Sequence, residues 1–88
     1  MFVRQFVYSE AAQIEIDTAR RKLANVDDLL MAVEWVIGRN PHRGHDLGDG
    51  KRFVYRTRKV SSLYPIATIL YSFDENEVSV EHIWIRPE

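Results

Sequence analysis

The sequence predicts a single α+β domain in which a helical hairpin packs on a small, largely antiparallel sheet, in the order β-α-α-β-β-β. In the first half of the chain, two consecutive stretches carry apolar residues three or four positions apart, the spacing of one helix face. In the second half, three apolar runs of strand length are separated by turn residues. With 88 residues, of which 45% are hydrophobic, the chain suits one domain over residues 1–88 with one modest core.

A strand is expected at the start of the chain. Residues 2–8 are rich in Phe, Val and Tyr and alternate loosely with polar residues, which is typical of an edge strand. Ser9 follows in the position of a helix N-cap, and Glu10 lies in the first turn, where a negative charge suits the helix dipole. The first helix then carries one apolar stripe, which consists of Ala12, Ile16, Ala19 and Leu23.

The second helix is expected to begin at Asn25 or Asp27. Because it starts so close behind the first helix, the two are expected to form an antiparallel hairpin. Gly38 together with Pro41 is expected to end it. Its predicted buried face consists of Val26, Leu29, Leu30, Val33, Val36 and Ile37.

The first strand of the second half is predicted over residues 53–60, after a polar loop over residues 40–51. Side chains two apart on a strand point to the same side. Val54, Arg56 and Arg58 are therefore expected to share one face of this strand.

The remaining two strands are predicted to form a hairpin. Residues 66–73 are almost continuously apolar, as in a central strand, and residues 74–76 form the turn. The last strand covers residues 78–85, and strict alternation assigns one face to Val78, Val80, His82 and Trp84. We expect core packing for three aromatic residues, namely Tyr71, Trp35 and Trp84.

Composition excludes several classes of function. The absence of cysteine removes disulfides, thiolate nucleophiles and zinc–thiolate sites. No stretch approaches the length of a membrane span, and the first residues lack the apolar core of a signal peptide. We therefore expect a soluble, cytoplasmic protein that has no membrane partner and uses no cofactor.

A short loop motif suggests a metal site at first sight. His42 and His45 are three residues apart, and Asp46 follows directly. Cations flank the motif and no cysteine can add to it, so the interpretation is a polar loop without a metal.

Charge is unevenly distributed along the chain. The net charge is −1, but residues 39–60 contain seven Lys or Arg against two acidic residues. A charge separation of this size creates a local positive field, which favours an anionic partner. The predicted anion-binding residues are Arg52, Arg56, Arg58, Lys59 and Arg86.

Guanidinium groups hold phosphate oxygens and can stabilise the charge that develops when a phosphodiester is cleaved. Cleavage also needs a proton acceptor and a donor for the leaving oxygen, for which the candidates in this region are His82, Tyr55, Tyr64 and Tyr71. If the protein is a nuclease, the candidate catalytic residues are Arg56, Arg58, Arg86 and His82.

Several motifs together resemble the RelE/ParE superfamily of bacterial toxins. They are SEAA at residues 9–12, NPHRG at 40–44, DLGDGKR at 46–52, YP at 64–65, ILY at 69–71, and V-x-V-x-x-I-x-x-R at 78–86. The resemblance covers nearly the whole chain and implies the same β-α-α-β-β-β fold. It also implies the toxin of a type II toxin–antitoxin system, which inhibits growth and is neutralised by a cognate antitoxin.

The resemblance implies two possible modes of action. RelE-like members cleave mRNA on the ribosome with arginines on three strands, and Arg56, Arg58 and Arg86 match two of these strands. On the middle strand this chain has Thr68 where such members carry an arginine. ParE-like members inhibit DNA gyrase without that catalytic set, so a ParE-like, non-nucleolytic mode is favoured. A degenerate, non-toxic protein-binding module is a third possibility.

Overall fold

The computed structural model describes residues 3–58 and 64–87, and its elements contain the predicted β-α-α-β-β-β order. The elements are β1 (Gln5–Tyr8), α1 (Glu10–Lys22), α2 (Val26–Arg39), the short 3-10 helix η1 (Pro41–Arg43), β2 (His45–Asp46), β3 (Phe53–Arg56), β4 (Ile66–Phe73) and β5 (Glu77–Arg86). Because η1 and β2 lie within residues 40–51, the prediction of a plain loop there is wrong. β3 is also shorter than predicted, since it ends at Arg56.

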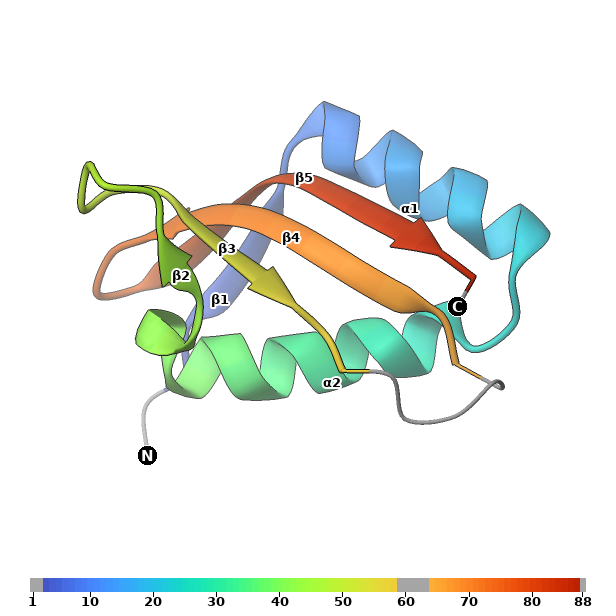
Figure 1. Ribbon diagram of the computed structural model, residues 1–88, viewed down its shortest axis with the longest axis horizontal. Helices are drawn as coiled ribbons and strands as arrows, with labels where there is room; N and C mark the ends of the chain where they lie inside the picture. The colour runs from blue at the N-terminus through green and yellow to red at the C-terminus, as the bar shows by residue number, and fades with distance from the viewer. Residues whose placement is uncertain (1–2, 59–63, 88) are drawn as a thin grey trace.

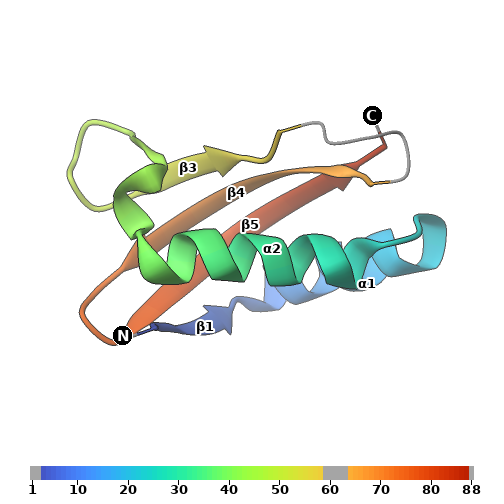
Figure 2. The same cartoon turned by 90° about the horizontal axis from the view of Figure 1, so that it is seen from below.

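The five strands form one mixed sheet in the order β1-β5-β4-β3-β2. β1 runs parallel to β5, and all other neighbours are antiparallel. β1 is therefore an edge strand and β4 lies in the centre, as predicted. Figures 1 and 2 show both helices on the same side of the sheet. The opposite side is not covered by a helix in the part of the chain that the structure describes.

Ser9 begins α1 and also ties this helix to the sheet. Its Oγ accepts a hydrogen bond from the Ala12 N–H at 3.0 Å, which confirms the predicted N-cap. The same hydroxyl donates to the Glu81 carbonyl of β5 at 2.6 Å. The predicted apolar stripe is buried at Ala12, Ile16 and Ala19.

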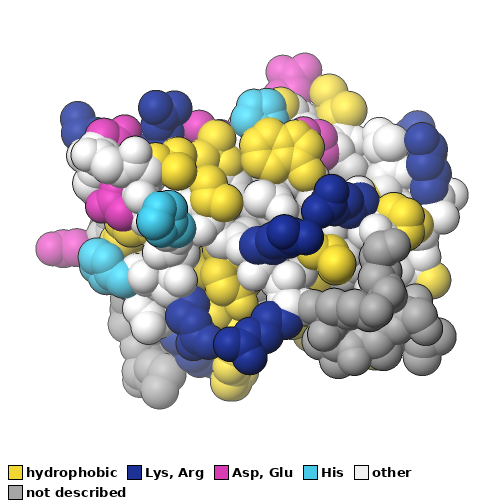
Figure 3. Space-filling view, in the orientation of Figure 1, with side chains coloured by type: hydrophobic (Ala, Val, Ile, Leu, Met, Phe, Trp, Pro, Cys, Tyr) yellow, Lys and Arg dark blue, Asp and Glu magenta, His cyan; other side chains and the backbone are white. Residues whose placement is uncertain are grey.

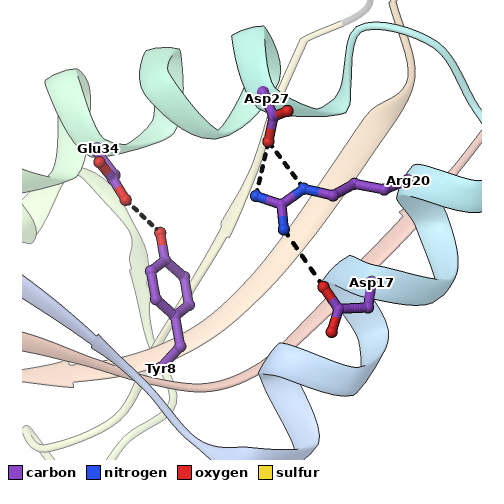
Figure 4. A network of polar contacts seen from close by, with 5 residues as sticks. All are labelled: Tyr8, Asp17, Arg20, Asp27 and Glu34. Carbon is purple, nitrogen blue, oxygen red and sulfur yellow. Dashed lines mark hydrogen bonds and ion pairs between the residues drawn. The ribbon is translucent and has the colours of Figure 1, made fainter.

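Polar contacts hold the helical hairpin together (Figure 4). The Arg20 guanidinium of α1 lies 2.7 Å from Asp27 Oδ1 of α2 and 3.3 Å from Asp17 Oδ1 of its own helix. On the same side of the hairpin, the Tyr8 hydroxyl of β1 donates to Glu34 of α2 at 2.6 Å. Burial, reinforced by this bond to Glu34, raises the pKa of the Tyr8 phenol.

The core lies between the helices and the sheet, and its largest fully buried side chain is Tyr71 of β4. Its members are Ala12, Ile16, Ala19, Val26, Leu29, Leu30, Val33, Ile37, Phe53, Ala67, Ile69, Tyr71, Val78, Val80 and Ile83. Tyr71 is a core residue, as expected. Trp35 is 63% exposed on α2 with the Arg39 guanidinium over its ring, so its prediction as a packing anchor is wrong.

Gly38 has a different role from the one predicted. It lies inside α2, which continues to Arg39, so it does not end the helix. A Cβ at this position would lie 3.3 Å from both the Phe6 ring and the Val3 side chain. Gly38 therefore allows the segment around β1 to approach α2 closely, and the Arg4 N–H donates to the Gly38 carbonyl at 3.3 Å.

A β-bulge divides β5 at Glu81. Tyr71 pairs with Val80 and Leu70 pairs with His82, so Glu81 has no partner on β4. The extra residue shifts the alternation, and Val78 and Val80 face the core. His82 and Trp84, in contrast, lie on the opposite face. The prediction that these four residues share one face is therefore wrong, because it assumed an unbroken strand.

The Tyr71 hydroxyl fixes the segment that follows α2. It donates to the Pro41 carbonyl at 2.5 Å and accepts from the Gly44 N–H at 3.1 Å. A Cβ on Gly44 would collide with this hydroxyl, so glycine is required there by the close approach. The turn that carries His42 and Arg43 is thus held from both ends against the core.

Candidate functional site on the open face of the sheet

The face of the sheet that no helix of the described residues covers is the candidate site, and we call it the open face. Pairing across the sheet sets its rows of side chains. One row contains Arg56 of β3, Thr68 of β4 and Trp84 of β5. The neighbouring row contains Val54, Leu70 and His82. Figure 3 shows Lys and Arg side chains over the middle of this face, next to large apolar side chains.

Arg56 and Arg86 are the two predicted cations that the structure brings together. Arg56 lies in the row of Trp84, and Arg86 follows Trp84 two residues later on the same face of β5. Two strand spacings and two residues along a strand separate their Cα atoms by about 12 Å. Long guanidinium side chains can span this distance to reach one phosphate or two neighbouring ones.

Arg58 does not join this face as predicted. The Thr57 N–H still bonds to the Ala67 carbonyl, but the Ala67 N–H is bonded by the Thr57 side chain at 2.9 Å. The backbone hydrogen bonds between β3 and β4 end at Thr57, because the Thr57 hydroxyl takes the place of a backbone carbonyl as the acceptor for the Ala67 N–H. Arg58 follows and lines a hollow beside α2 instead.

Arg52, another predicted cation, is not part of a strand of the sheet. Arg52 lies in the turn before β3 and pairs with Asp49 at 3.5 Å. Backbone N–H groups of Arg52 and Lys51 donate to Asp49 and lower the pKa of its carboxyl. Asp49 is thus a turn residue that engages Arg52 locally. Lys59 lies outside the described residues.

His82 is oriented by a carboxylate that the sequence did not point to. His82 Nδ1 lies 3.3 Å from Glu15 Oε1 of α1. The same oxygen accepts the Ile83 N–H at 3.0 Å, so Glu15 also pairs the free edge of β5 beyond the bulge. With Nδ1 facing Glu15, Nε2 is the ring nitrogen left for a ligand.

Trp84 is an exposed aromatic platform rather than a packing anchor. It is 48% exposed, and its ring stacks on His82 with a centroid distance of 5.3 Å and an interplanar angle of 13°. This corrects the prediction that Trp84 is buried. Strict alternation missed this exposure, because the bulge before Trp84 decides on which face of the sheet its side chain lies.

The candidate loop histidines do not form a metal site. Among the residues that the structure describes, no group of three or more His, Cys, Asp or Glu side chains is arranged to hold a metal ion. His42 instead packs edge-on against Phe73, with ring centroids 5.0 Å apart. Asp46 Oδ1 accepts from the N–H groups of Gly48 and Gly50, so it is a turn residue.

The open face therefore combines two guanidinium groups, an exposed indole and an imidazole held by a carboxylate. Guanidinium groups bind phosphate, and an exposed aromatic face stacks on an unpaired base. An imidazole with a carboxylate partner can accept a proton. Within the described residues, neither helix is long and apolar enough to cross a membrane.

Comparisons with protein-family models, with curated proteins and with solved structures found no match to this chain.

Proposed function

We propose that this protein is the toxin component of a type II toxin–antitoxin system, growth-inhibitory in the cytoplasm and neutralised by a cognate antitoxin. The observation that carries the proposal is the open face, where Arg56 and Arg86 flank the exposed Trp84. The motifs that resemble the RelE/ParE superfamily, together with the β-α-α-β-β-β order, support it from the sequence side. In this proposal the open face binds the cellular target.

We favour a ParE-like, non-nucleolytic mode, in which the target is DNA gyrase. Thr68 occupies the centre of the open face, between Arg56 and Trp84, where it separates the cations. Two separated guanidinium groups are sufficient to bind an acidic surface, whereas three converging ones would be expected of a phosphodiester-cleaving site.

A second candidate function is a RelE-like endoribonuclease that acts on ribosome-bound mRNA. The observation that favours it is the Glu15–His82 pair beside Trp84. His82 would accept the proton of the ribose 2′-hydroxyl as this oxygen attacks the adjacent phosphorus. Arg56 and Arg86 would stabilise the charge on the phosphoryl oxygens, and water would protonate the leaving 5′-oxygen.

Inducible expression in bacteria tests the proposal, with growth, protein synthesis and DNA supercoiling followed side by side. The expected result is growth arrest with altered supercoiling while early translation continues. Rapid loss of translation with cut transcripts would instead identify the endoribonuclease. Expression without any growth defect would contradict both toxin modes and leave a protein-binding module.

Variants locate the activity on the open face. The double variant Arg56→Gln and Arg86→Gln should abolish growth arrest in either mode, since both cations contact the target. His82→Ala should abolish it in the endoribonuclease alone. Arg21→Gln removes an exposed cation of α1 and serves as the matched control. Equal loss of toxicity in the control and the double variant would rule out the open face as the site.

A further inference from the structure

A second hollow lies between α2 and the end of β3, apart from the open face. We call it the α2–β3 groove, and its volume is about 460 Å³. One wall is the flank of α2 formed by Leu29, Ala32, Val33 and Val36. The facing wall consists of Tyr55, Thr57, Tyr64 and Pro65. Its volume lies in the range of small-molecule sites, which is about 300–1,000 Å³. Its mostly apolar lining is also typical of such sites.

Two arginines reach this groove from different elements. Arg43 lies in η1, which the Tyr71 hydroxyl holds from both sides through Pro41 and Gly44. Arg58 is directed here because the ladder of β3 ends at Thr57. Within the described residues neither guanidinium forms an ion pair. Unpaired cations beside an apolar lining are complementary to a ligand with an apolar body and an anionic head.

Asp28 also lines the groove and opposes an anion near it. It lies in the first turn of α2, whereas Arg43 follows the other end of that helix. Asp28 and Val36 are eight residues apart, which corresponds to about 12 Å along the helix axis. The anionic head is therefore favoured at the Arg43 end, with the apolar body along the flank of α2 toward Asp28.

We propose that the α2–β3 groove binds a small aromatic carboxylate. The carboxylate accepts hydrogen bonds from Arg43, with Arg58 adding to the positive field. The ring lies between Val36 of α2 and Tyr55 of β3, where aromatic stacking adds to the burial of apolar area. This site is distinct from the one assigned to toxicity, and it stands whether or not the protein arrests growth.

Titration with 2-naphthoate tests the proposal, with isothermal calorimetry for affinity and amide chemical shifts for location. We expect saturable binding with shifts at Ala32, Val36 and Thr57. The neutral analogue 2-naphthalenemethanol should bind about tenfold more weakly, because it lacks the charge that Arg43 recognises. Equal affinities for acid and alcohol would overturn the proposal, as would shifts located on the open face.

Variants of the groove distinguish the contribution of its arginines to binding from that of its apolar wall. Arg43→Gln should weaken 2-naphthoate about tenfold, Arg58→Gln should weaken it less, and Asp28→Asn should not weaken it. Arg56→Gln removes a cation of β3 that does not line the groove and should leave 2-naphthoate binding unchanged. Ala32→Trp fills the groove and should abolish binding of the acid and the alcohol alike. Unfolding midpoints show that each variant is folded, and unchanged affinity in Arg43→Gln would refute the assignment.

Discussion

The two halves of β5 have different surroundings. Before the bulge, Val78 and Val80 lie between β1 and β4 and are buried under the helices. After the bulge, the strand has β4 on one side and Glu15 of α1 on the other. There His82 and Trp84 lie on the open face, and His82 contacts Glu15 of α1 at the edge of the sheet.

This difference shows how one strand can serve the core and the candidate site together. Glu81 has no partner on β4, so the alternation of side chains shifts by one residue at this point. Ser9 holds the bulge because its hydroxyl donates to the Glu81 carbonyl. The start of α1 and the change of face in β5 are thus fixed by the same side chain.

The largest effect is expected from deleting a residue of β5 before the bulge. Without Ser79, a regular strand can keep Ile83 inward only by turning Val80 outward and Glu81 inward. A buried carboxylate and a lost apolar contact together should cost more than about 4 kcal/mol, which is enough to unfold a chain of this size. Urea unfolding followed by circular dichroism measures this.

Deletion of Glu81 is the matched control for that experiment. It restores regular alternation with Val80 and Ile83 both inward, and every remaining pair with β4 can stay in register. The expected cost is about 1–3 kcal/mol, from the lost partner of the Ser9 hydroxyl and the altered twist. If the Glu81 deletion were as damaging as the Ser79 deletion, the bulge would not be what assigns the two faces.

The next largest effect on stability is expected at Ile83, which we compare with its neighbour Trp84 beyond the bulge. Ile83 is 1% exposed in the core, so Ile83→Ala should lower the free energy of unfolding by about 2–5 kcal/mol. Trp84→Ala removes a larger side chain from the open face and should cost less than about 1.5 kcal/mol. Urea denaturation of both variants measures the difference. Equal costs would place Trp84 in the core.

Most of the fold could be predicted, because the spacing of apolar residues and the capping of a helix both depend on residues that are close together in the sequence. The N-cap at Ser9, the stripe of α1 and the apolar run of β4 all follow from neighbouring residues. The bulge also has a signal that strict alternation overlooked. The apolar positions Val80 and Ile83 are three apart, which a regular strand cannot place on one face.

The candidate site was less predictable because it depends on contacts far apart in the sequence. Glu15 reaches His82 across 67 residues, and no local pattern marks that contact. Arg58 has the correct spacing to accompany Arg56, yet the Thr57 hydroxyl ends the ladder first. Exposure of Trp84 likewise depends on which face of the sheet the helices cover, and this is set by contacts between elements far apart in the sequence.

A smaller effect on stability is expected from the Tyr71 hydroxyl, a polar group on the face of the sheet that the helices cover. Burial raises the pKa of the Tyr71 phenol to about 12, although the Gly44 N–H opposes this rise. Its pKa in the unfolded chain is about 10. Because the folded pKa is the higher one, Tyr71 contributes its full stability below about pH 10 and loses it as the pH rises toward 12.

Tyr71→Phe should therefore flatten the fall of stability over that alkaline window. At neutral pH it should cost about 1–3 kcal/mol, because the buried Pro41 carbonyl and Gly44 N–H lose their partner. Urea unfolding at stepped pH gives both values. Tyr64→Phe alters an exposed phenol and should retain the alkaline fall. An undiminished fall in Tyr71→Phe would assign it to another group, with Tyr8 next to be tested.

The smallest effect on stability is expected from Thr68→Arg, which adds a cation at the centre of the open face. Because the new side chain can extend to solvent, the free energy of unfolding should change by less than about 1 kcal/mol. The added guanidinium lies between Arg56 and Trp84 and so joins the cations into one row. If this face can bind RNA, the affinity for a single-stranded oligoribonucleotide should rise, and the logarithmic salt dependence should steepen by about 0.7.

Fluorescence anisotropy with a labelled oligoribonucleotide over a series of salt concentrations measures both quantities. Ser72→Arg is the matched control, since it adds the same charge to the same face of β4 at the end beside Ser79. A larger gain for Thr68→Arg means that position relative to Trp84 decides binding, as expected of a face on which bases stack. Equal gains mean that net charge alone decides, and the open face would then be a general cationic surface for acidic partners, which is what a gyrase-binding mode requires.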